Sequence, residues 1–261
     1  MMLEMTGQWY RWIPSTDSRF VTEPIALDPA RTAIIGMHCW NIGCPDGPPV
    51  DPNFAVGMVY EFTAQACAKI MTDRIVPAFD AARQVGMTVC HVEPTIIARK
   101  HPEACEDEDP PDPPPSHTPP PVVPGHSEAM RDRAHGKYLE GSPYTQMDRA
   151  AIVAPQPGDV YCHQTGQLDR ALRRRGIENL IYTGFATDMC VLRAPGGIEP
   201  MIEFGYRLFI MRDATLGVEY PDTFDQRTIT ESALRYFESH FGDSVMFDDF
   251  IAACRRIGAN S

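Results

Sequence analysis

Short apolar runs alternate with helical segments along this chain, and this alternation restricts the fold more than any other feature. Each run has the length and composition of a strand that is buried on both faces. We expect such strands at residues 32–37, 87–92, 157–162, 179–183 and 206–211, with a sixth candidate at 244–247. Apolar residues at helical spacing lie between them, as over residues 69–85 and 230–241. The pattern predicts an α/β fold, a three-layer α/β/α sandwich around a central, mainly parallel sheet.

One domain with two short flanking segments is the expected organisation. Residues 1–30 precede the first predicted strand and have the character of an irregular N-terminal arm, which packs on its own domain or on a neighbouring subunit. The domain is expected over residues 31–250 and a C-terminal tail over residues 251–261. Within the domain, residues 95–148 are a predicted surface insertion, because ten prolines and an acidic run in residues 101–124 exclude a helix or a central strand.

Acidic residues dominate the charge of the chain. Asp and Glu number 35 against 23 Lys and Arg, which gives a formal net charge of −12. Such a surface does not attract nucleic-acid phosphates and repels anionic lipid headgroups. No run approaches the roughly 18 apolar residues of a membrane span, and the N-terminus lacks a signal-peptide pattern. We therefore expect a cytoplasmic protein that acts on a small-molecule substrate and binds neither nucleic acid nor membrane.

The eight cysteines are scattered along the chain and form no CxxC pair. This spacing indicates reduced thiols in a core, and it gives no sign of a disulfide framework or a structural zinc site of the usual spacing. A reactive cysteine has to be identified from its local setting.

Chemistry-bearing side chains follow the predicted strands, which is where parallel sheets bind their ligands. The residues in question are His38 and Cys39, His91 and Glu93, Cys162, His163 and Gln164, Cys190, and Asp213. Cys190 is the best candidate nucleophile, because a glycine-rich turn into a helix places its sulfur near helix-terminal N–H groups. That setting lowers a thiol pKa and provides oxyanion donors. A buried structural thiol is the alternative.

The segment Gly184-Phe-Ala-Thr-Asp-Met-Cys-Val191 resembles the nucleophile turn of the isochorismatase-like cysteine hydrolases. Supporting similarity covers residues 25–94 and 145–250, including an A-P-x-P-G-D turn at residues 154–159. The resemblance implies a hydrolase that cleaves an amide-type C–N bond of a small molecule through a thioester intermediate. It also implies that the protein is a homo-oligomer, as members of this family often are.

Two of the three catalytic residues that the family uses, Cys, Asp and Lys, are not matched. Cys190 lies at the nucleophile position, but His38 stands where the family has Asp. The lysine position holds His163 or Gln164. The chain is therefore a divergent relative whose chemistry has to be argued from its own residues.

Three hypotheses follow from the strand-end residues. In the first, His38 is the base for Cys190, Lys137 or another residue of the insertion supplies the cation, and the N–H groups around Met189 and Cys190, in the turn that begins at Thr187, bind the oxyanion. In the second, the protein has lost catalysis and acts as a binding or assembly subunit. In the third, a metal such as zinc is bound by His38, His91, Glu93 and His163. The first requires no cofactor, and its expected substrate pocket contains Trp40, His91, Glu93, His163 and Gln164.

Overall fold

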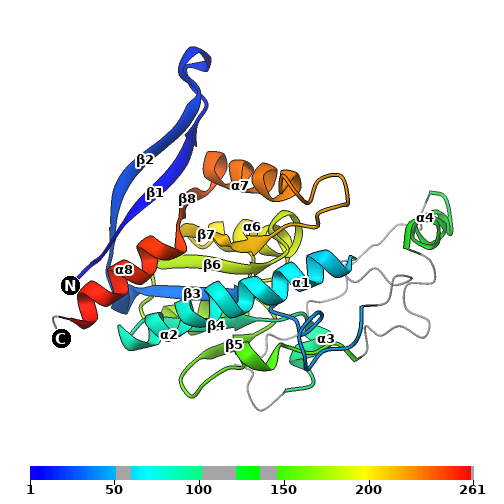
Figure 1. Ribbon diagram of the computed structural model, residues 1–261, viewed down its shortest axis with the longest axis horizontal. Coiled ribbons are helices and arrows are strands. Elements are labelled where there is room, and N and C mark those ends of the chain that lie inside the picture. Colours follow the sequence, from blue (N-terminus) through cyan, green and yellow to red (C-terminus); the bar gives the residue numbers. More distant parts are fainter. Residues whose placement is uncertain (51–59, 102–121, 136–145, 260–261) are drawn as a thin grey trace.

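The computed structural model describes residues 1–50, 60–101, 122–135 and 146–259. Its centre is one sheet of eight strands in the order β2-β1-β8-β7-β6-β3-β4-β5 (Figure 1). The six strands from β8 to β5 run parallel, and the strand β1 pairs antiparallel with both of its neighbours. The parallel strands are β3 (Thr32–Met37), β4 (Thr88–Val92), β5 (Val160–Cys162), β6 (Asn179–Phe185), β7 (Arg207–Leu216) and β8 (Gly242–Val245). The expected α/β fold with a mainly parallel sheet is confirmed.

Helices cover both faces of this sheet, because successive strand residues point to opposite sides. Ile34 and Ile181 belong to one core cluster, whereas their neighbours Ile35 and Tyr182 belong to the other. The first cluster is covered by α1 (Glu61–Ile70), the π-helical turn Met71–Ile75, α2 (Val76–Gln84) and α8 (Phe247–Gly258). The second is covered by α5 (Thr165–Arg174), α6 (Ile198–Ile202) and α7 (Thr228–His240). The helical segment predicted over residues 69–85 is therefore present, and it begins earlier, at Glu61.

The N-terminal arm is a β-hairpin, and the expected irregular structure is wrong. It consists of β1 (Leu3–Arg11) and β2 (Arg19–Leu27), joined by a turn that contains a short 3-10 helix, Ser15–Asp17. Figure 1 shows the hairpin rising from the edge of the sheet beyond the body of the protein. Leu3 and Met5 are buried while the residues beside them are exposed, the alternation of a half-buried strand.

The expected C-terminal tail is also wrong over most of its length. Residues 251–258 lie in α8, where Cys254 and Ile257 are buried in the core. The helix forms because its apolar residues recur at helical spacing on the side that faces the sheet. Only residues 260–261 lie outside the described part of this segment.

The insertion contributes two short helices to the described structure. They are α3 (Thr95–Ala98) and α4 (His126–His135), while most of the proline-rich segment lies outside the described residues. Lys137, the suggested source of a cation, lies outside them as well. No helix in the described ranges is long and apolar enough to cross a membrane.

Candidate active site

The strand order brings the predicted site residues to one end of the sheet. The strands β6, β3, β4 and β5 are neighbours, and their carboxyl ends point the same way. Cys190 follows β6, and His38 follows β3, where its N–H donates to Val92 at 2.8 Å. Glu93 follows β4 and donates its N–H to the carbonyl of Cys162 at 3.0 Å. The candidate nucleophile and base thus follow adjacent strands.

A tight connection carries the chain from β6 to Cys190. Gly184 has a φ of 99°, and a Cβ there would lie 2.1 Å from the carbonyl oxygen of Met37, so only glycine fits. The π-helical turn Thr187–Val191 follows. The N–H groups of Met189 and Val191 donate to the carbonyl of Ala186 at 3.1 and 3.0 Å. The expected role of the Met189 N–H as an oxyanion donor is therefore wrong in this arrangement, since that hydrogen bond holds the turn together.

Two buried hydroxyls brace the same turn from β7. The Thr215 hydroxyl donates to the carbonyl of Gly184 at 2.7 Å. The Thr187 hydroxyl lies 2.7 Å from that of Thr215, and it is the donor because the Thr215 proton is already used. On the other side, the Asp188 carboxylate accepts from the N–H of Val218 at 2.9 Å. Thr187 thus positions the turn and has no proton left for an oxyanion. Sequence reasoning missed Thr215, which carries no motif.

Burial sets the ionisation of Cys190. It raises the pKa of the Cys190 thiol, and a hydrogen bond with the Ala186 backbone opposes this effect without cancelling it. The prediction of a lowered thiol pKa is therefore wrong. The thiol is neutral at rest, although its side chain is only partly covered.

His38 is held in an unusual backbone conformation for a residue other than glycine, with a φ of 48°. Its ring stacks on that of Trp40 with centroids 5.5 Å apart. The side chain is buried, and burial lowers the pKa of His38 to about 3. Its Nδ1 atom is buried and has no hydrogen-bond partner among the described residues. The imidazole is therefore neutral and has an unused polar atom.

A buried carboxyl and a guanidinium lie close to these residues. Glu93 is 2% exposed, and burial raises its pKa to about 8 against the opposing effect of Arg149. Arg149 forms a β-bridge with Trp40, which places its backbone beside the segment that follows β3. Three buried atoms here lack a partner in the described part of the chain: Glu93 Oε2, Arg149 Nη1 and Trp40 Nε1. Buried polar atoms are rarely left unpaired, so this cluster has the character of a binding site. Arg149 is a site residue that sequence reasoning missed.

Three predicted pocket residues hold the scaffold together. His91 Nε2 lies 3.0 Å from the Asp159 carboxylate, which also binds Arg83. His163 Nδ1 lies 3.2 Å from the Thr95 hydroxyl. Gln164 is the N-cap of α5 and forms a capping box with Gln167. Their polar groups are therefore used in contacts within the protein.

The four suggested metal ligands do not fit a metal ion in this arrangement. The imidazole of His91 is engaged by Asp159, and that of His163 by Thr95. Across the described ranges, no group of three or more His, Cys, Asp or Glu residues is placed to hold one.

The chain is similar to known hydrolases. No family model matches it. It is 28% identical over 270 residues to the ureidoacrylate amidohydrolase RutB of Rhizobium rhizogenes, with 96% of each chain covered. A cysteine hydrolase from Pseudomonas syringae superposes with a TM-score of 0.56 at 17% identity, covering 95% of this chain and 98% of the other. An isochorismatase family protein from Desulfovibrio vulgaris gives a TM-score of 0.51 at 16% identity, covering 88% and 98%. The nucleophile turn and the strand order agree with these similarities, so the resemblance of the chain to the isochorismatase-like cysteine hydrolases is confirmed.

Proposed function

We propose that the protein hydrolyses a C–N bond of a small amide or ureido compound, with Cys190 as nucleophile and His38 as base. One observation carries the proposal. Cys190 lies in a braced turn at the end of β6, and the adjacent β3 ends in a buried, neutral His38 whose Nδ1 has no partner among the described residues. The RutB relative is named an amidohydrolase of ureidoacrylate, which supports this substrate class.

The ionisation of the two residues determines how the first step proceeds. A thiol with a raised pKa does not transfer its proton to an imidazole with a pKa of about 3 at rest. The proton therefore moves to His38 as the sulfur attacks the carbonyl carbon, so that no free thiolate accumulates. A tetrahedral intermediate forms, and His38 returns the proton to the leaving nitrogen as the C–N bond breaks. The products of this step are an amine and a thioester on Cys190.

Water completes the cycle. His38 takes a proton from a water molecule, whose oxygen attacks the thioester carbonyl, and the Cys190 sulfur leaves and recovers the proton. The acid is released. The oxyanion in both steps is stabilised by the N–H of Cys190, and Arg149 supplies positive charge in place of the family lysine. The reaction uses groups of the chain and water, and draws on no cofactor.

The test is ammonia release from a panel of primary amides and N-carbamoyl compounds. Cys190→Ser and His38→Gln are each expected to lower kcat by roughly 10²-fold or more. Cys254→Ala and His240→Gln are the matched controls, since Cys254 lies in α8 and His240 ends α7. A hydrolysis rate that survives Cys190→Ser contradicts the proposal. Folded protein that turns over no compound in the panel, and forms no acyl adduct at Cys190 by mass spectrometry, favours a silent binding protein.

We also propose that copies of the chain associate, as expected from the family resemblance. The turn of the N-terminal hairpin carries Trp12 and Ile13, which are 57% and 84% exposed. Apolar side chains at the end of a projecting hairpin suit contact with a second copy. Light scattering at micromolar concentration tests this, and a monomer there contradicts it.

A further inference from the structure

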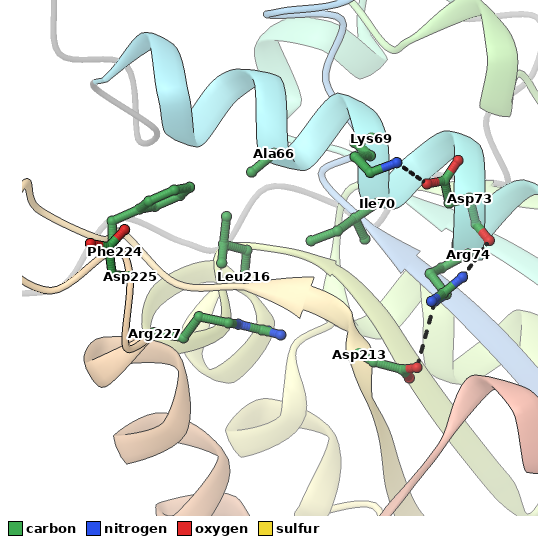
Figure 2. Close-up of a pocket in the computed structure, with 10 residues that line it drawn as sticks. All are labelled: Ala66, Lys69, Ile70, Asp73, Arg74, Asp213, Leu216, Phe224, Asp225 and Arg227. Carbon is green, nitrogen blue, oxygen red and sulfur yellow. Dashed lines mark hydrogen bonds and ion pairs between the residues drawn. The ribbon is translucent and has the colours of Figure 1, made fainter.

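A pocket of about 470 Å³ lies between α1 and β7 (Figure 2). Its walls are α1, the π-helical turn Met71–Ile75, β7 and the segment 224–227 that leads to α7. The volume falls in the range of small-molecule sites. None of its ten lining residues belongs to the cluster around Cys190, His38 and Glu93. Its lining residues are therefore distinct from those of the candidate active site.

Apolar side chains form much of the wall. Ala66 and Ile70 come from α1, Leu216 from the end of β7, and Phe224 from the following segment (Figure 2). The Phe224 ring packs edge to face on Phe62 with centroids 4.6 Å apart, which fixes its position. An apolar body of a ligand would be desolvated against these side chains.

Most of the charges in the pocket are already paired. Lys69 and Asp73 form an ion pair at 2.5 Å, and Arg74 lies 3.6 Å from Asp213. Asp213 also accepts from the N–H of Phe247 at 2.9 Å. The Asp225 side chain is exposed to solvent. These groups therefore leave little net charge to attract a ligand.

Within the described ranges, Arg227 is not paired with a carboxylate in this way. Its Nη2 donates to the carbonyl of Thr215 at 2.8 Å, which anchors the side chain. Its Nε is buried without a hydrogen-bond partner, and no carboxylate among the described residues forms an ion pair with it. Figure 2 shows the guanidinium extending from the turn before α7 toward Asp213, past Leu216. A fixed and uncompensated guanidinium beside an apolar wall favours a carboxylate, which it binds with paired, charge-assisted hydrogen bonds.

We infer that this pocket binds a small molecule with an apolar body and one carboxylate, which Arg227 engages. The inference rests on the cavity, its apolar wall and the unpaired guanidinium, and it is independent of the proposed hydrolysis. Cys190 does not line this pocket, so the Cys190→Ala variant distinguishes binding here from binding of the substrate.

The experiment is calorimetric titration of the full chain with 4-phenylbutyrate and with 4-phenyl-1-butanol, which lacks the carboxylate. We expect the acid to bind roughly 10- to 100-fold more tightly than the alcohol, the ratio that one charge-assisted interaction provides. Arg227→Met is expected to remove most of this difference. Arg173→Met, on α5 at the opposite face of the sheet, is the matched control and should leave both affinities unchanged. Cys190→Ala should also leave them unchanged.

A second variant covers the case in which Arg227→Met fails to fold. Ala66→Leu fills the pocket from α1 without altering any charge, and it is expected to weaken binding of the acid at least about tenfold. Three results would each overturn the inference: no binding of the acid at millimolar concentration, equal affinity for acid and alcohol, or full binding in Ala66→Leu. Loss of binding in Cys190→Ala would place the probe at the strand ends and would also overturn it.

Discussion

Replacing the buried Glu93 by Gln should stabilise the protein, by an amount that grows with pH. The pKa of Glu93 is 4.5 in an unfolded chain and about 8 in the folded protein, chiefly because of burial. Between these values the folded state holds a proton that the unfolded state has lost. Stability is therefore lost as pH rises, at about 1.36 kcal/mol per pH unit. Gln cannot ionise, so the variant escapes this loss, and the gain at pH 7 is about 3 kcal/mol.

Urea unfolding of the two proteins at pH 4, 5.5, 7 and 8.5 measures the effect. The difference in the free energy of unfolding should be close to zero at pH 4, rise through the middle of this range, and level off above pH 8. Glu203→Gln is the control, since Glu203 is exposed just after α6. A difference that does not change with pH would refute the reasoning, because it would mean that Glu93 ionises alike in both states. The reasoning would also be refuted if Glu93→Gln became less stable than the unmutated protein as pH rises.

Two other variants test the scaffold of the site. Burial alone would raise the pKa of Asp159, but hydrogen bonds with His91 and Arg83 outweigh it and lower the pKa from 3.8 to about 2. The stability that results from the lowered pKa is present above pH 3.8 and is lost as pH falls toward 2. Asp159→Asn lacks this contribution of about 2 kcal/mol, so in an acid titration it should unfold at a higher pH than the unmutated protein. An unchanged acid midpoint would show that Asp159 is not the anchor. Thr215→Val removes the hydrogen bond to Gly184 and the acceptor for Thr187, and should cost about 2 kcal/mol in thermal unfolding. If Cys190 is the nucleophile, Thr215→Val should also lower kcat by a larger factor than it raises KM. Thr6→Val, on the exposed face of β1, is the control and should change neither kcat nor KM.

The parallel strands could be predicted because each is a continuous apolar run. Residues 32–37, for example, are buried throughout as β3. The hairpin could not be recognised in the same way, since it is half-exposed and joins the sheet through β8, which lies near the other end of the chain. The position of Cys190 at a strand end follows from local sequence and strand order.

The properties of the site depended on contacts that the sequence does not display. The thiol pKa of Cys190 is set by what covers it, and the Met189 N–H is used by a carbonyl three residues earlier. Arg149 and Thr215 reach the site only through the pairing of distant segments, a bridge to Trp40 and a hydrogen bond to Gly184. Such partners require the folded topology, because nothing in their local pattern differs from that of ordinary surface or strand residues.

The two outer strands of the sheet differ from its centre in a way that bears on aggregation. At one edge, β5 has only three residues, too few to recruit a strand from another molecule. At the other edge, β2 is nine residues long but contains Pro24, which lacks an N–H, next to the charged Glu23. Each edge thus carries a feature that discourages indefinite strand-by-strand growth. Exchanging Pro24 for a β-branched residue would remove that protection from the longer edge, at which the sheet is most open to extension.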